Sequence, residues 1–157
     1  MRPIFITGIG TGVGKTLISA IVTEALGAYY WKPVQAGFTD GTDSEWVGER
    51  ISAPRVLPEV YKLKLPASPH IAAREEGAVI SLDKIATALS EISAALPAGR
   101  PLVIEGAGGL LVPLNEREFV LDLVKKLEAN LILVKGAVPG AAGRMVFVHT
   151  AAKGGAV

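Results

Sequence analysis

The sequence predicts an α/β fold in three layers, with a mostly parallel sheet covered by helices on both faces. Two observations lead to this prediction. Short apolar runs bounded by glycine alternate with longer segments that carry apolar residues at helical spacing, which is typical of parallel strands joined by crossover helices. Half of the 157 residues are hydrophobic, so one domain can bury a substantial core.

The expected elements follow from the spacing of apolar residues and from the residues that end each run. The expected strands are 3–7, 29–34, 102–104 and 131–134, and the expected helices are 15–26, 44–51, 81–96 and 120–129. Ser81 is a natural N-cap for the third helix. The polar stretch 37–43 is expected to be a loop near a site. The region 53–76 is harder to read, because four prolines interrupt every candidate element, although 71–75 is helix-like.

Charge and composition exclude several classes of function. The chain has sixteen Lys and Arg and fifteen Asp and Glu, for a net charge of +1. It contains no block of like charge that would suit a nucleic acid or an anionic membrane. There is no cysteine, which excludes disulfides, a cysteine nucleophile and thiolate metal sites. The apolar run 3–6 is too short for a signal peptide or a membrane span. We therefore expect a soluble cytoplasmic protein that binds neither nucleic acid nor membrane.

Residues 7–16 read Thr-Gly-Ile-Gly-Thr-Gly-Val-Gly-Lys-Thr and lie between an expected strand and an expected helix, as a phosphate-binding loop (P-loop) requires. Glycines let backbone N–H groups converge on phosphate oxygens, and the helix N-terminus adds its positive dipole end. Lys15 is expected to reach the β- and γ-phosphates of a nucleoside triphosphate, and the Thr16 hydroxyl to bind Mg²⁺. Gly8 stands one position before the usual first glycine. The alternative is an ordinary glycine-rich turn.

Three charged residues are expected near this loop. Lys32 follows the second strand and would project into the crevice where open α/β sheets bind ligands, although it could also be a solvated surface lysine. Asp43 and Glu105 could complete a Mg²⁺ site with Thr16, since Mg²⁺ prefers oxygen ligands. Glu105 follows a buried strand, where a carboxylate has little structural reason to be. Asp40 competes with Asp43, and either could belong to an Asx-turn.

Two histidines and the C-terminal segment carry less information. His70 follows Ser-Pro and could cap a turn or contact substrate, and we favour the structural role. The segment 135–157 is rich in glycine and alanine, and its composition resembles a linker or a shifted reading frame. It holds one candidate strand, 145–149, and His149 is assigned no role. We accordingly predict a P-loop nucleotide-binding domain over 1–134, followed by an atypical tail.

Five segments in a fixed order resemble the ATP-dependent dethiobiotin synthetase family. They are the loop 7–16, Lys-Pro-Val-Gln-Ala-Gly at 32–37, Thr-Asp-Ser at 42–44, Ser-Pro-His at 68–70 and Glu-Gly-Ala-Gly-Gly-Leu-Leu-Val-Pro-Leu at 105–114. The early Gly8 is also similar to this family's version of the loop. The resemblance covers residues 3–134 and implies a three-layer P-loop fold.

The resemblance also implies an activity. In this family an amine of 7,8-diaminononanoate captures CO₂ as a carbamate, ATP phosphorylates the carbamate, and the second amine displaces phosphate to close the cyclic urea of dethiobiotin. The partners it implies are Mg²⁺, ATP, the diamine, CO₂ and a second copy of the chain in a homodimer. It assigns catalysis to Lys15, Lys32 and Thr11, the diamine to Lys32 and Ala36, and Mg²⁺ to Thr16, Asp43 and Glu105. It assigns the nucleotide to Gly12, Val13, Gly14, Lys15, Thr16, Leu17, Glu105, Gly106, Ala107 and Gly108.

The sequence departs from the family at two places, and two other functions remain open. Ala36 stands where the family often has a hydroxyl residue. The family's C-terminal part, which helps bind adenine and form the dimer, is not recognisable after residue 134, so we expect a truncated or frameshifted ending. One alternative is therefore an inactive fragment that still binds nucleotide. The other is a partitioning-type P-loop ATPase switch, which would need neither 32–37 nor 68–70.

Overall fold

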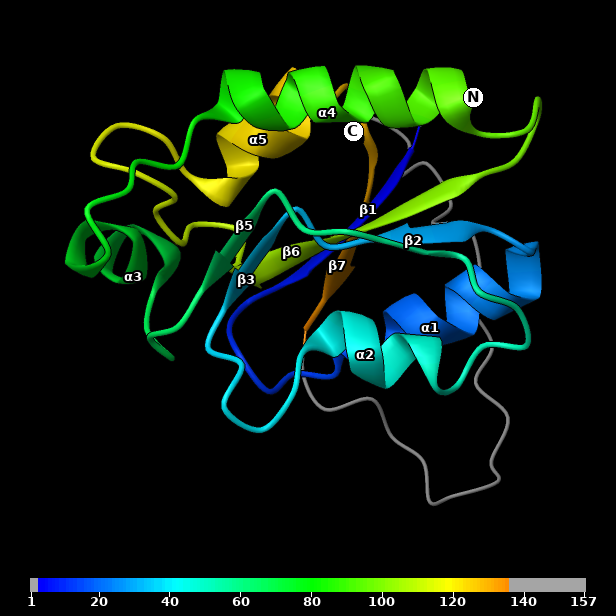
Figure 1. Cartoon of the computed structure of the whole chain (residues 1–157), viewed down its shortest axis with the longest axis horizontal. Coiled ribbons are helices and arrows are strands. Elements are labelled where there is room, and N and C mark those ends of the chain that lie inside the picture. Colours follow the sequence, from blue (N-terminus) through cyan, green and yellow to red (C-terminus); the bar gives the residue numbers. More distant parts are fainter. Residues whose placement is uncertain (1–2, 136–157) are drawn as a thin grey trace, which may run out of the picture.

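The structure of this chain is a computed structural model, and it describes residues 3–135. Its centre is a five-stranded sheet in the order β4-β2-β6-β1-β7, in which every pair of neighbours is parallel (Figure 1). The strands are β1 (Ile4–Gly8), β2 (Tyr29–Trp31), β4 (Val56–Leu57), β6 (Leu102–Gly109) and β7 (Asn130–Val134).

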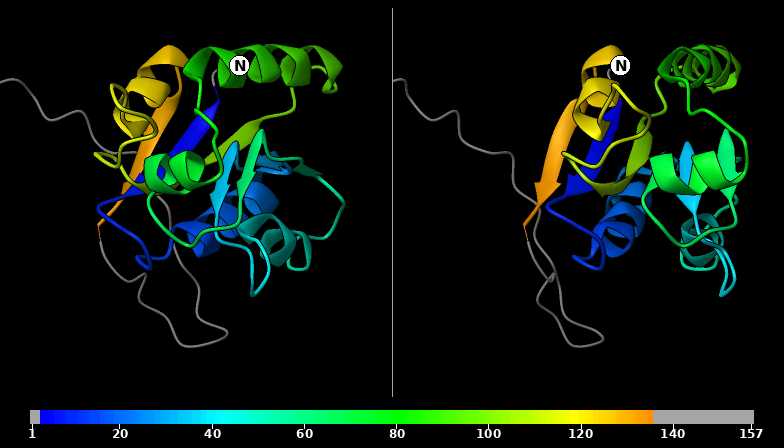
Figure 2. Two further views of the ribbon diagram at one scale, coloured as in Figure 1. Left: turned by 60° about the vertical axis from the view of Figure 1, so that its left-hand side comes forward. Right: turned by 90° about the vertical axis from the view of Figure 1, so that its left-hand side faces the viewer.

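Helices cover both faces of this sheet, as Figures 1 and 2 show. One face carries α1 (Lys15–Leu26) and α2 (Asp43–Gly48), and the other carries α4 (Leu82–Ala95) and α5 (Val120–Lys126). Two separate cores result, because successive residues of a strand point to opposite faces. Phe5 packs in the core beneath α4 and α5, and its neighbour Ile6 packs in the core above α1. The predicted three-layer α/β fold is confirmed.

Several predicted elements match closely. Helix α1 covers the predicted 15–26, and β7 begins one residue before the predicted strand. The Ser81 hydroxyl accepts a hydrogen bond of 3.3 Å from the N–H of Lys84, so Ser81 caps α4 as expected. Helix α5 ends at Lys126 rather than at residue 129. The reason is Glu128, whose φ of 48° is left-handed and does not continue a helix.

The predicted strand 29–34 begins correctly at Tyr29, but its predicted end is wrong. The chain leaves the main sheet after Trp31 and starts β3 (Val34–Ala36), which pairs in parallel with β5 (Tyr61–Leu63) in a small second sheet. Pro33 lies at the break, and it has no N–H to donate to a ladder. Its carbonyl instead accepts from the N–H groups of Val60 and Tyr61. This departure leaves Lys32 at the carboxyl edge of the main sheet.

Three further regions differ from the prediction or complete it. Strand β6 runs to Gly109 instead of ending at residue 104, because its glycine-rich half still pairs with Gly8 of β1. Helix α2 begins at Asp43 and ends at Gly48. The stretch 53–76 holds β4, β5 and α3 (Pro69–Glu75). Helix α3 contains the helix-like 71–75 and begins two residues earlier, with Pro69 in the first turn, where the missing N–H costs nothing.

None of the helices within residues 3–135 has the length and apolar character needed to cross a membrane. The candidate strand 145–149, His149 and the rest of the predicted tail beyond Lys135 lie outside the described residues.

Candidate functional site

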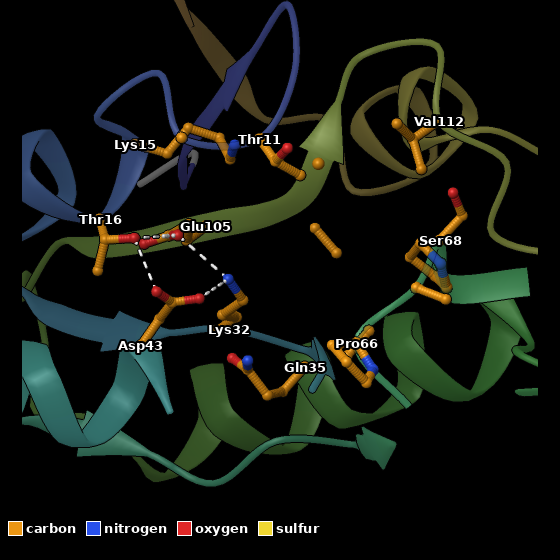
Figure 3. Close-up of a pocket in the computed structure, with 16 residues that line it drawn as sticks. Thr11, Lys15, Thr16, Lys32, Gln35, Asp43, Pro66, Ser68, Glu105 and Val112 are labelled. Atoms are coloured by element: carbon orange, nitrogen blue, oxygen red, sulfur yellow. Dashed lines mark hydrogen bonds and ion pairs between the residues drawn. The ribbon is translucent and has the colours of Figure 1, made fainter. Parts of the chain in front are cut away.

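A cavity of about 570 Å³ opens at the carboxyl edge of the main sheet (Figure 3). This is the edge at which open α/β sheets bind ligands. It gathers residues from the loop after β1, from the end of β2, from the start of α2 and from β6. The predicted site residues that line it are Thr11, Gly12, Lys15, Thr16, Lys32, Ala36, Asp43, Glu105, Ala107 and Gly108.

Four residues predicted to bind the nucleotide do not line this cavity. Val13 packs against the core on the α1 side, and Gly14 is the N-cap of α1 with a left-handed φ of 96°. Leu17 is 40% exposed on α1. Gly106 lies against the Phe5 ring, which a Cβ would approach to 2.8 Å. The nucleotide role of these four residues therefore stays a prediction.

The phosphate-binding loop folds around its own lysine. Gly12 and Gly14 have φ values of 69° and 96°, which favour glycine. The Nζ atom of Lys15 donates to the carbonyl of Gly10 at 2.6 Å, and the side chain is largely buried. Burial lowers the pKa of Lys15, although the nearby Glu105 carboxylate opposes the effect. Phosphate oxygens would be far stronger partners for this ammonium group than a carbonyl.

Close backbone contacts hold this loop on both sides, and they explain the early glycine. The N–H of Ile9 donates to the carbonyl of Val134 at 3.2 Å, and the N–H of Leu110 donates to that of Gly8 at 2.9 Å. A Cβ on Gly8 would lie 2.6 Å from Cγ2 of Val13 and 3.1 Å from the Val134 oxygen. Gly8 is thus required by packing against Val13 within the loop and against β7.

A cluster of oxygens and one ammonium group lies on the floor of the cavity (Figure 3). The Thr16 hydroxyl oxygen is 2.9 Å from Oδ1 of Asp43 and 3.0 Å from Oε1 of Glu105. The Nζ atom of Lys32 is 3.2 Å from the same Glu105 oxygen and also pairs with Oδ2 of Asp43. Only 1% of Glu105 is exposed. The structure therefore brings together four residues that the sequence separates by up to 89 positions.

The charges of this cluster shift the pKa values of Lys32 and Asp43. Burial alone would lower the pKa of Lys32, but the attraction of Glu105 and Asp43 outweighs it and raises that pKa. Burial would raise the pKa of Asp43, but the Lys32 ammonium and the hydrogen bond from Thr16 lower it. The directions agree, and both favour a charged pair.

The cluster fits a bound Mg²⁺. Thr16 has one hydroxyl proton and two carboxylate neighbours, so one carboxylate contact lacks a proton at any moment. A cation bound between the Thr16, Asp43 and Glu105 oxygens would interact favourably with all three residues. Within residues 3–135 no group of three or more His, Asp or Glu could hold a metal ion by itself. The remaining ligands would have to be phosphate oxygens and water, as is usual for Mg²⁺.

Sequence reasoning missed two buried polar residues of the site. The Tyr30 hydroxyl donates to Oε2 of Glu105 at 2.9 Å, and burial together with the Glu105 charge raises the Tyr30 pKa well above its usual value. Gln35 lines the cavity and donates to the Gly37 carbonyl at 2.7 Å, while its Oε1 has no partner among the described residues. A buried tyrosine hydroxyl needs a partner, but the sequence did not show that β6 lies beside β2.

The other candidates lie apart from the cluster. Asp40 is exposed and does not line the cavity, so the geometry favours Asp43. Ser68 lines the cavity, whereas His70 lines a second cavity of about 700 Å³ with Arg74. The Nδ1 atom of His70 is buried without a hydrogen-bond partner among residues 3–135.

Comparison with known proteins gives one family and a set of similar enzymes. The chain matches the family model described as "AAA domain" over residues 2–156. It is 46% identical, over 84% of its length, to the ATP-dependent dethiobiotin synthetase of Rhodopseudomonas palustris, of which it covers 59%. It is 48% identical over 85% of its length to that of Novosphingobium aromaticivorans and 42% identical over 85% to that of Paramagnetospirillum magneticum, covering 62% of each. The chain thus spans about six tenths of these curated relatives.

Proposed function

The chain belongs to the AAA domain family, and from this membership and its similar enzymes we propose that it is an ATP-dependent dethiobiotin synthetase. Its substrates would be 7,8-diaminononanoate, CO₂ and ATP with Mg²⁺. One observation carries the proposal. Two buried lysines, Lys15 and Lys32, line the same cavity as the oxygen cluster of Thr16, Asp43 and Glu105. This arrangement suits a reaction whose reactants are a carbamate and a triphosphate, because both are anions.

The proposed reaction has three balanced steps. One amine attacks CO₂, a C–N bond forms, and a proton leaves to give a carbamate. A carbamate oxygen then attacks the γ-phosphorus of ATP, and the bond to the β-phosphate oxygen breaks to release ADP. The second amine attacks the carbamoyl carbon and loses a proton as the new C–N bond forms. The C–O bond to the phosphate breaks, phosphate leaves, and the cyclic urea is closed. No step needs a covalent bond to the protein, so positioning and charge stabilisation suffice.

The residues of the cavity would divide this work. Lys15 would turn from the Gly10 carbonyl to the phosphate oxygens. Lys32 would neutralise the carbamate at the carboxyl edge of β2, with Ala36 beside the diamine and Thr11 near the reacting end. Thr16, Asp43 and Glu105 would hold the Mg²⁺, which when bound neutralises charge on the β- and γ-phosphates.

The experiment is phosphate release by the purified chain with Mg·ATP and bicarbonate, with and without the diamine. A nonanoate that carries a single amine is the matched control, since it can form a carbamate but cannot close the ring. We expect release with the diamine, together with dethiobiotin detected by mass spectrometry. ATP binding without diamine-dependent release would instead support a nucleotide-binding but inactive chain. Release stimulated only by a protein partner would support the switch.

The homodimer that the resemblance implies belongs to the same proposal. Leu131 and Leu133 of β7 are 42% and 49% exposed. Strand β7 is the outer strand of the sheet formed by residues 3–135, and apolar side chains on such a strand are a suitable contact surface. Sedimentation velocity of the purified chain would determine whether a dimer forms. A monomer at micromolar concentration would contradict this part of the proposal and leave the proposed chemistry untouched.

A further inference from the structure

We infer that Tyr30 is a positioning residue for metal binding: its hydroxyl holds the Glu105 carboxylate in the orientation that presents one oxygen to the cavity. The inference rests on the proposed function, and specifically on the binding of nucleotide with Mg²⁺ at the oxygen cluster. It adds a residue that none of the predicted motifs contains.

The two oxygens of Glu105 have different partners. Oε2 accepts the hydrogen bond of 2.9 Å from Tyr30. Oε1 lies 3.0 Å from the Thr16 hydroxyl and 3.2 Å from Nζ of Lys32. The terminal torsion of a glutamate is broad and does not fix the carboxylate by itself. The Tyr30 hydroxyl therefore fixes the orientation of the carboxylate group, with one oxygen toward the interior and the other toward Thr16.

The fold fixes Tyr30 in this place. Tyr30 pairs with Val103 across β2 and β6, and Glu105 lies two residues further along β6, on the same face of the sheet. The ring packs in the core on the α1 side and is fully buried, while Glu105 is 1% exposed. Bulk water has little access to this hydrogen bond, so it cannot readily replace a missing hydroxyl. Partners of this kind, which orient a metal ligand from behind, strongly influence metal affinity.

Tyr30→Phe tests the inference, because it removes the hydroxyl and keeps the ring. The readout is the affinity for a fluorescent, non-hydrolysable ATP analogue, measured once in EDTA and once in Mg²⁺. We expect the affinity in EDTA to stay near the wild-type value and the gain caused by Mg²⁺ to fall by about tenfold. A residue with only a structural role would lower stability without changing this gain.

Tyr61→Phe is the matched control. The Tyr61 hydroxyl also has a backbone partner, since it accepts a partly buried hydrogen bond from the N–H of Ser81 at 2.9 Å, but it does not line the cavity of the oxygen cluster. This variant should lose a hydrogen bond and keep the full gain from Mg²⁺. An equal gain in Tyr30→Phe and in the wild type would overturn the inference, as would an equal loss in both tyrosine variants.

A second comparison covers the case in which Tyr30→Phe does not fold. Glu105→Gln removes the buried charge that the tyrosine satisfies, so adding Tyr30→Phe to it should be tolerated and should not reduce the Mg²⁺ gain further. A further reduction would contradict the inference. Failure of the proposed function would look different: diamine-dependent phosphate release would be absent while the Mg²⁺ gain and its dependence on Tyr30 remained.

Discussion

The ammonium group of Lys32 and the carboxylate of Glu105 form a buried ion pair, with Nζ 3.2 Å from Oε1 and side-chain exposures of 6% and 0%. Asp43 pairs with the same ammonium group and is one-third exposed. Two carboxylates thus share one lysine. Together with the Thr16 hydroxyl, these carboxylates present oxygen atoms to the cavity, and oxygen is the ligand atom that Mg²⁺ prefers.

Lys32→Met should destabilise the protein when no metal is bound. The variant leaves Glu105 buried without its cation, and breaking a buried pair in this way costs about 3–5 kcal/mol. Urea unfolding monitored by circular dichroism measures the change. Saturating Mg²⁺ and a non-hydrolysable ATP analogue should restore part of the lost stability, because the metal supplies the missing positive charge.

The control for this variant is Lys62→Met. Lys62 pairs with Glu45 at 3.9 Å, and both side chains are well exposed, 45% and 61%. Exposed pairs contribute about 0–1 kcal/mol, so this variant should unfold close to the wild type. Similar destabilisation in both variants would show that Lys32 does not compensate a buried charge.

Lys15→Ala should remove most of the affinity for ATP. Its ammonium group would make two phosphate contacts, and hydrogen bonds to charged groups contribute about 1.5–3 kcal/mol each, so the dissociation constant should rise about a hundredfold or more. Isothermal titration calorimetry measures the change. Lys64→Ala alters an exposed lysine that does not line the cavity, and its affinity should be unchanged. Undiminished ATP binding by Lys15→Ala would contradict the assignment of residues 7–16 as a phosphate-binding loop.

Thr42→Ala should weaken both the fold and the site. The Thr42 hydroxyl accepts from the N–H of Glu45 at 3.0 Å, and the Glu45 carboxylate accepts from the N–H of Thr42 at 2.7 Å. This capping box starts α2 at Asp43. Its loss should cost about 0.5–2 kcal/mol and should reduce the Mg²⁺-dependent part of nucleotide affinity, because Asp43 is less firmly held.

Ser81→Ala is the control that separates the loss of stability from the loss of Mg²⁺-dependent nucleotide affinity. Ser81 caps α4 on the other face of the sheet, so it should lose stability of a similar size and keep the Mg²⁺-dependent affinity. Thermal unfolding and nucleotide titration of the two variants give both quantities. If both variants behave alike in the titration, the position of Asp43 does not depend on its cap.

Much of the fold follows from local signals in the sequence. The helix at 15–26 and the cap at Ser81 were predicted because apolar spacing and capping are local properties. The end of the strand predicted at 29–34 is wrong, because a strand end depends on its pairing partner and the chain changes sheets at Pro33. The length of β6 was missed for the same reason, since Gly109 continues the strand only through its pairing with Gly8.

The candidate site likewise contains residues that the sequence predicts and residues that only the pairing of the strands reveals. Thr16, Lys32, Asp43 and Glu105 were predicted from chemistry and spacing, and the structure places them together. Tyr30 was missed because its polar role depends on Glu105, 75 residues away. Alternation along the strand places Tyr30 and Lys32 on one face. Only the strand order β2-β6 shows that this face meets the glutamate.

Gly109→Ala should distort the phosphate-binding loop from outside it. A Cβ on Gly109 would lie 2.9 Å from the carbonyl carbon and oxygen of Ile9 and 3.1 Å from the nitrogen of Gly10. These are backbone atoms that cannot rotate away, so the loop or the end of β6 must shift. Overpacking of this kind costs about 1–3 kcal/mol. We expect weaker ATP binding, because small displacements impair backbone N–H groups that must converge on phosphate.

Gly48→Ala is the control, since its Cβ would meet only Cγ2 of Val56 at an ordinary 3.5 Å and alanine favours the helix. It should bind ATP like the wild type and be at least as stable. Wild-type ATP affinity in Gly109→Ala would show that the contact between β6 and Ile9 does not shape the phosphate site.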